Sequence, residues 1–291
     1  CETPEINGIS HVIEHMFFKG TSNRTYKEIA VDMDNLGAQY NAFTGKEYTC
    51  FHAKGIREEF PEVCDILFDM IKNSLFDENE MKKERGVILE EMRMGEDTPD
   101  EYALDLLSEA VFDGTDLSKS VIGTRKALKG IHRGDILAYI KEQYVKDSIV
   151  VSVVGNYNEK ILISQINDYF GDFKKSKKQR KSGELSGKQK FISKTRDINQ
   201  SHLVLGIPTV SLKSEDYYVQ SIVNEVLGGR MSSMLFQNIR EERGLAYTVF
   251  SSPMAYTNHG ILFIYAGVSL GKEAAAIAGI AEELEALGKN G

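Results

Sequence analysis

Hydrophobic side chains recur at helical spacing from the start of the chain. In residues 8–19, Ile, Val, Met and Phe return every three or four positions, and Gly20 follows directly, as a helix stop would. The same pattern covers residues 26–36 and stops at Gly37. Both segments are therefore predicted to be amphipathic helices.

A strand-like segment separates these helices from several more. Residues 39–54 are rich in Tyr, Thr, Phe and Cys around the turn-like Gly45-Lys46, which predicts one or two strands. Helical periodicity then returns over 58–74 and 78–96, and Asp77 is expected to cap the second of these helices. The β-branched run 148–154 predicts a strand, and further helices are expected over 100–112, 134–144 and 158–170.

A basic stretch divides the chain. Residues 174–181 read Lys-Lys-Ser-Lys-Lys-Gln-Arg-Lys, and Ser and Gly follow. We interpret this composition as a solvated linker. A nucleic-acid-binding module is the alternative, but no aromatic residues interleave with the lysines. The expected domains are residues 1–178, a basic linker 179–190, and residues 191–291.

The second half repeats a mixture of strands and helices. Strands are expected over 201–207, 246–252 and 260–268, and helices over 215–227, 231–242 and from Lys272 onward. Helices mixed with antiparallel-looking strands indicate an α+β fold in both halves, each a mostly antiparallel sheet packed with helices.

Composition narrows the function classes. The 291 residues are 42% hydrophobic and 27% charged, with a formal net charge of −8, which is a poor match to a general nucleic-acid binder. No apolar run approaches the ~18 residues that span a membrane. Three cysteines without a CxxC pair do not form a disulfide framework. A reducing compartment fits best, and the cytoplasm is the expected location.

The segment from His11 to His15 reads His-Val-Ile-Glu-His. On a helix, residues four apart share a face, so both imidazoles can aim at one point, and Glu14 lies beside them. Two neutral imidazoles suit zinc, and a neighbouring carboxylate suits proton transfer from water. This order of residues is the inverzincin signature, the reverse of His-Glu-x-x-His.

Catalytic zinc takes a third protein ligand, and the helix over 78–96 offers carboxylates. Glu84 and Glu91 are seven residues apart and share one face, whereas Glu90 points about 100° away from Glu91. One of the two can bind the metal while the other orients a histidine. Spacing alone leaves open which residue does which.

These motifs resemble the pitrilysin/insulinase family of zinc peptidases, in particular the branch of mitochondrial processing peptidase and its bacterial relatives. The residues from Glu2 to Thr21 resemble the family's active-site helix, and Tyr40-Asn41-Ala42-Phe43-Thr44 resembles its edge-strand motif. The segment from Glu84 to Glu91 resembles the source of its third ligand. The resemblance implies that Zn²⁺ is held by His11, His15 and Glu91, with Glu84 behind them.

The second half resembles the family's C-terminal homologous domain, which does not bind metal. The quoted segments are Gly228 to Ser233 and Arg240 to Tyr247. The family's substrate-contacting pair falls on Arg240 and Tyr247. The resemblance implies that both are catalytic residues: Tyr247 would help to stabilise the oxyanion, and Arg240 would hold a backbone carbonyl of the substrate. Measured against the family, a first strand and a C-terminal portion are absent, so the second domain is expected to be incomplete, and the loop 114–118 lacks the usual His-Pro.

The resemblance implies a zinc-dependent endopeptidase that cleaves short or unfolded peptides inside a closed chamber. Glu14 would be the general base, and Asn41 and Ala42 would pair with the substrate backbone as an added strand. Two such chains enclose the chamber in the family's short-chain branch, so a homodimer or a related second subunit is expected, without membrane or nucleic-acid partners. The alternative function is a catalytically silent structural or regulatory subunit.

Overall fold

The computed structural model describes residues 2–175 and 183–290, and its chain divides into two compact units. The first comprises Cys1–Met92 and Ser120–Lys181, and the second Arg93–Lys119 and Ser182–Gly291. Residues 176–182, which include part of the predicted basic run and linker, lie outside the described residues. The predicted domains were continuous, so they assigned Arg93–Lys119 to the first domain, whereas this segment packs within the second unit.

The first unit carries most of the described helices, and the bounds of its predicted helices match the observed ones to within two residues. Its elements are η1 (Pro4–Ile6), α1 (Ile9–Phe17), α2 (Tyr26–Asn35), β1 (Gln39–Thr44), β2 (Thr49–Lys54), α3 (Phe60–Lys72), α4 (Glu78–Asp97), α6 (Arg125–Gly130), α7 (Arg133–Gln143), η3 (Lys146–Ser148) and α8 (Glu159–Phe170). The last residues of α4 belong to the second unit. The short helix α6 was not predicted.

Helix α1 lies at the centre of the first unit's core. Ile9, Ile13 and Met16 are fully buried and pack in one cluster with residues of α4, α6 and α7. Fully burying one such side chain contributes about 1.5–3 kcal/mol. The start of α1 crosses another backbone segment closely: a Cβ on Gly123 would lie 2.2 Å from the carbonyl oxygen of Asn7. Packing and this crossing together fix the position of α1.

Helix α4 begins as predicted. The Asp77 carboxylate oxygen Oδ1 accepts the backbone N–H groups of Asn79, at 2.9 Å, and Glu80, at 3.1 Å. These are donors that a first helical turn leaves without partners, so the cap is confirmed.

Strands β1 and β2 form an antiparallel hairpin in which Gln39 faces Lys54 and Thr44 faces Thr49.

The predicted strand over 148–154 was wrong. These residues form no strand, and the side chains of Val150 and Val154 are 90% and 97% exposed. β-branched composition favours extended backbone, but a strand also needs a neighbour to complete its hydrogen bonds, and no strand of the described residues pairs with this segment.

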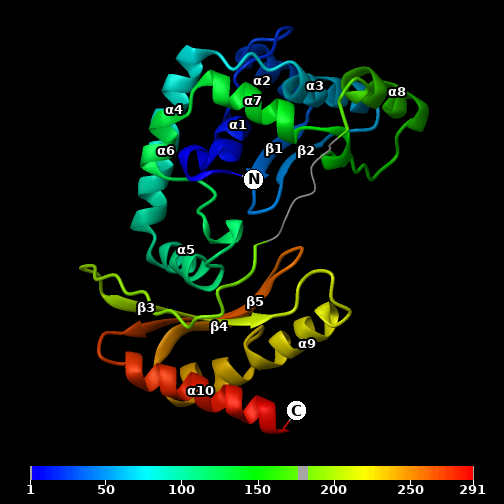
Figure 1. Ribbon diagram of the computed structural model, residues 1–291. Coiled ribbons are helices and arrows are strands. Elements are labelled where there is room, and N and C mark those ends of the chain that lie inside the picture. Colours follow the sequence, from blue (N-terminus) through cyan, green and yellow to red (C-terminus); the bar gives the residue numbers. More distant parts are fainter. Residues whose placement is uncertain (1, 176–182, 291) are drawn as a thin grey trace. The chain divides into compact units, whose positions relative to one another are not determined.

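The second unit is built on a three-stranded antiparallel sheet of order β3-β5-β4 (Figure 1). The strands are β3 (Gln200–Thr209), β4 (Ala246–Ala255) and β5 (Gly260–Ser269). The helices are α5 (Pro99–Val111), the short η2 (Asp116–Ser118), α9 (Tyr217–Leu227), η4 (Phe236–Glu242) and α10 (Glu273–Asn290). The mixture of helices and antiparallel strands confirms the predicted α+β class.

Helices cover both faces of this sheet. Figure 1 shows α5 on one face and α9 and α10 on the other. On central β5, Phe263 and Tyr265 pack with Leu107 of α5, while Ile264 and Ala266 pack on the opposite face. A strand buried on both sides needs an almost unbroken apolar run, as β5 has. This packing is the reason that Arg93–Lys119 belongs to the second unit.

One helix of the second unit differs from its prediction. The predicted helix over 231–242 is a π-helix over Phe236–Glu242, in which the Arg243 N–H donates to the Asn238 carbonyl at 3.0 Å.

Within the described ranges, no helix combines the length and apolar character needed to cross a membrane.

Candidate metal centre

Helix α1 aims two imidazoles at the same place. His11 and His15 are one helical turn apart, and their ring centroids are 4.7 Å from each other. The opposite face of α1 is buried in the core, which leaves these polar side chains on the remaining face. The orientation of the pair is therefore fixed by the burial of the rest of the helix.

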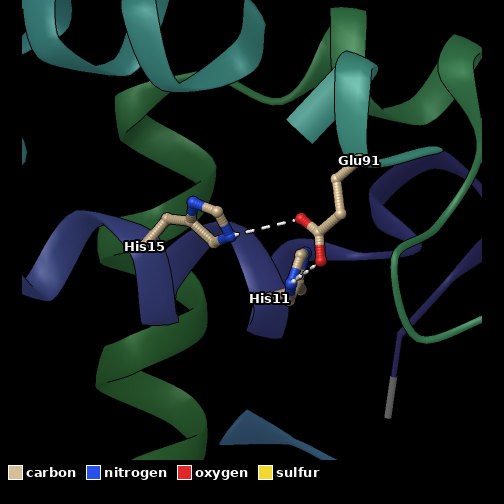
Figure 2. A group of neighbouring side chains, drawn as sticks. All are labelled: His11, His15 and Glu91. Atoms are coloured by element: carbon tan, nitrogen blue, oxygen red, sulfur yellow. Dashed lines mark ion pairs between the residues drawn. The ribbon is translucent and has the colours of Figure 1, made fainter. Parts of the chain in front are cut away.

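Helix α4 brings a carboxylate to the two imidazoles (Figure 2). The Nε2 atom of His11 lies 3.6 Å from Oε1 of Glu91, and Nε2 of His15 lies 3.5 Å from Oε2. All three residues offer ligand atoms within 4.8 Å of one another. The sequence-predicted ligands thus come together from segments far apart in the chain.

The spacing of these atoms suits a tetrahedral cation. Separations of 3.5–3.6 Å are longer than a hydrogen bond. Two atoms that each lie ~2.0–2.1 Å from one zinc ion, at tetrahedral angles, are roughly 3.3–3.4 Å apart. Two imidazoles and one carboxylate are also the donor types of catalytic zinc sites with an open position. The residues present therefore fit zinc.

The electrostatics of the site also suit a cation. Burial, with a smaller contribution from the nearby His15 charge, lowers the pKa of His11 to about 4, so its imidazole is neutral near pH 7. Burial raises the pKa of Glu91; the His15 charge opposes this shift, and the Glu14 charge adds to it. Neutral imidazole is the form that binds metal, and a cation bound beside Glu91 would favour its ionised carboxylate.

Glu84 lies behind the site and contacts His15. Its side chain is nearly buried, and Oε2 is 3.1 Å from Nδ1 of His15. The other oxygen, Oε1, is 2.6 Å from Nζ of Lys19. Glu90, next to Glu91 on α4, is exposed. Spacing had left the roles of Glu84 and Glu91 open, and the contacts differ: Glu91 faces both Nε2 atoms, and Glu84 faces an Nδ1.

Glu14 is held by the hairpin. The Thr44 hydroxyl, at the end of β1, donates a hydrogen bond to Oε2 of Glu14, and Thr49 Oγ1 lies 3.3 Å from the Thr44 hydroxyl. From the sequence, Thr44 was noted as part of the Tyr40–Thr44 motif without a predicted role, and Lys19 was not predicted to belong to the site. Neither residue carries a local signal, because their partners are 30 and 65 positions away.

Among the described residues, no hydrogen bond or ion pair joins Asn41 or Ala42 to this cluster. Asn41 is exposed on β1, and its Oδ1 accepts the backbone N–H of Ala42 at 2.8 Å. In the described part of the chain, β1 pairs with β2 alone. Of this strand, it is Thr44 whose hydrogen bond reaches the candidate site.

Arg240 and Tyr247 lie together in the second unit, whereas the histidine–glutamate cluster belongs to the first. The guanidinium of Arg240 is 5.3 Å from the centre of the Tyr247 ring and 4.5 Å from that of Phe236. Tyr247 is 77% exposed. These residues line a cavity of about 310 Å³ together with Gly228 and Met231.

Comparison with known proteins matches both parts of the chain. Residues 1–125 match the family model described as insulinase (peptidase family M16), and residues 130–291 match the model described as the peptidase M16 inactive domain. A protein named uncharacterized zinc protease YmxG, from Bacillus subtilis, is 40% identical over 290 residues, which are 100% of this chain and 71% of that protein. A protein named uncharacterized zinc protease SCO5738, from Streptomyces coelicolor, is 34% identical over 276 residues, which are 91% of this chain and 60% of that protein.

Two solved structures share the fold. A protease from Helicobacter pylori aligns with a TM-score of 0.86 at 20% identity, over 99% of this chain and 74% of that one. A peptidase M16 inactive domain from Pseudomonas fluorescens aligns with a TM-score of 0.85 at 18% identity, over 96% and 70%. The chain thus spans about 60–74% of the length of these relatives.

Proposed function

Since the chain belongs to the insulinase family, peptidase family M16, we propose that it is a zinc-dependent endopeptidase whose metal ligands are His11, His15 and Glu91. The observation that carries this proposal is the convergence of two imidazoles and one carboxylate at separations of 3.5–3.6 Å. Two relatives carry the name uncharacterized zinc protease, which agrees with the proposal.

The residues around the ligands have separate tasks. When bound, zinc supplies Lewis-acid activation of water and of the scissile carbonyl. Glu14 accepts the proton from the attacking water at Oε1, because Oε2 already accepts the Thr44 hydroxyl. His11 and His15 bind through Nε2, and the contact of His15 Nδ1 with Glu84 orients its ring.

The proposed substrates are short or unfolded peptides in extended conformation. A peptide can add to the edge of β1 that has no strand partner among the described residues, with Asn41 and Ala42 facing it. Backbone pairing gives loose sequence preference and requires a segment free of its own secondary structure. We further propose that Arg240 and Tyr247 contact the substrate, and that a second copy or a related subunit completes the chamber.

The test is the substitution Glu14→Gln, with cleavage of a fluorogenic unstructured peptide and bound zinc both measured. The variant is expected to keep its zinc and to lose cleavage by about 10²–10⁴-fold, the usual contribution of a general base. Glu90→Gln, on the exposed side of α4, is the matched control and should cleave normally.

Cleavage retained by Glu14→Gln would remove Glu14 from its role. A parent protein that binds zinc and cleaves nothing would favour the silent-subunit alternative.

A further inference from the structure

The nearly buried carboxylate of Glu84 is held by two residues from the end of α1 and the turn that follows it. Glu84 is 7% exposed, and each of its oxygens has one partner: His15 Nδ1 at 3.1 Å from Oε2, and Lys19 Nζ at 2.6 Å from Oε1. His15 lies in the last turn of α1, and Lys19 lies two residues beyond the helix end at Phe17. Glu84 itself belongs to α4, the helix that carries Glu91.

The end of α1 turns the chain so that Lys19 can reach α4. The Lys19 N–H donates to the Met16 carbonyl at 3.1 Å, which tightens the last turn. Gly20 follows with φ +107°, a left-handed conformation that favours glycine and leads the chain away. The ion pair between Lys19 and Glu84 therefore ties together the two helices that hold the three candidate ligands.

The two contacts on Glu84 fix the direction of its carboxylate. The terminal torsion of a glutamate is broad, so a single contact leaves the carboxylate plane free to turn. With Oε1 held by Lys19, Oε2 faces Nδ1 of His15. An ionised carboxylate only accepts hydrogen bonds, so Nδ1 carries the proton and Nε2 presents its lone pair toward Glu91.

His11 lacks such support. Its Nδ1 is buried and has no hydrogen-bond partner among the residues that the structure describes. Apart from the contact of its Nε2 with Glu91, packing orients that ring, whereas the ring of His15 is also held at Nδ1 by Glu84. An effect of Lys19 on the centre should accordingly pass through His15.

We infer that Lys19 is a positioning residue of the metal centre, which acts through Glu84 to orient His15 for zinc. This inference rests on the proposed function, because it assumes that His15 is a ligand. In the contacts described, Lys19 touches none of the candidate ligand atoms.

The test is zinc affinity, measured by competition with a chromophoric chelator, so that no peptidase assay is needed. Lys19→Met keeps the length of the side chain without its charge. It is expected to weaken zinc binding by roughly 10-fold, the lower end of the effect of removing a group that holds a ligand directly, because Lys19 acts one contact further out. Lys19→Arg should restore most of the affinity. Lys83→Met is the matched control: it removes a lysine that is 67% exposed and pairs with Glu80 on α4.

A double-mutant cycle tests the route. Lys19→Met added to Glu84→Gln is expected to cause no further loss, because the intermediary is already changed. In the metal-free protein, the long-range ¹H–¹⁵N NMR signals of His15 should report a single Nδ1–H tautomer in the parent and a mixture in Lys19→Met. If Lys19→Met does not fold, Lys19→Gln takes its place with the same expectation.

The outcomes separate the two ideas. Zinc affinity within twofold of the parent in Lys19→Met, while His15→Ala loses zinc, would overturn the inference and leave the proposed function standing. Losses that add fully in the double mutant would also overturn it. If His11→Ala and Glu91→Gln leave zinc binding unchanged, the proposed function fails, and the inference falls with it.

Discussion

Asp69 anchors the turn that follows α1, and replacing it by Asn should destabilise the first unit strongly. The carboxylate is fully buried on α3 and accepts four hydrogen bonds. Oδ1 accepts from Asn23 Nδ2 at 2.6 Å and Asn73 Nδ2 at 2.7 Å. Oδ2 accepts from Thr21 Oγ1 at 2.7 Å and Arg24 Nη1 at 3.0 Å.

The size of the effect follows from this pairing. An amide replaces one oxygen by an NH₂ group, which is a donor, so two of the four donors must face another donor whichever way the side chain turns. Each buried donor without an acceptor costs about 1–3 kcal/mol, and breaking a buried ion pair typically costs about 3–5 kcal/mol. We expect Asp69→Asn to lower the free energy of unfolding by about 3–5 kcal/mol.

The measurement is urea unfolding of parent and variant, followed by circular dichroism. Asp65→Asn is the matched control on the same helix, since Asp65 also pairs with Arg24, at 2.7 Å, but its side chain is 38% exposed. A loss of about 1 kcal/mol or less is expected there. The reasoning is refuted if Asp69→Asn loses no more stability than Asp65→Asn.

Three further predictions follow from the same structure. Burial raises the pKa of Asp69, but its four hydrogen bonds outweigh burial and hold that pKa below the usual 3.8, so the stabilisation is complete above about pH 4. The difference in unfolding free energy between parent and Asp69→Asn should therefore narrow only at more acidic pH, as urea titrations from pH 7 to 3 would reveal. Gly123→Ala should lower the melting temperature sharply, because its Cβ would meet the Asn7 carbonyl at 2.2 Å and φ is +83°, whereas Gly130→Ala, with open space around it, should not; equal melting temperatures would contradict this. Burial raises the pKa of the Cys64 thiol to about 11, so Cys64→Ser should leave the number of thiols labelled quickly at pH 8 unchanged, and a loss of one labelled thiol would count against it.

Much of the fold was predictable because its signals are local. Helical periodicity with a glycine stop placed α1 and α2, and the cap at Asp77 fixed the start of α4. The pattern failed where an element depends on a distant partner. Residues 148–154 have the composition of a strand but no neighbouring strand to pair with among the described residues. The segment Arg93–Lys119 belongs to the second unit, although the first unit precedes it in sequence, because its apolar side chains pack on β5.

The sequence by itself determined which residues of the candidate site share a face: His11 and His15 by one helical turn, Glu84 and Glu91 by two. Spacing did not say whether the two helices meet, although the resemblance to the family implied that Glu91 joins the histidines. The tertiary structure decided that α1 and α4 meet, that Glu91 faces both Nε2 atoms, and that Lys19 and Thr44 hold Glu84 and Glu14. Helical periodicity is set by neighbouring residues, whereas contact between two helices depends on how the whole core packs, and no short stretch of sequence contains that information.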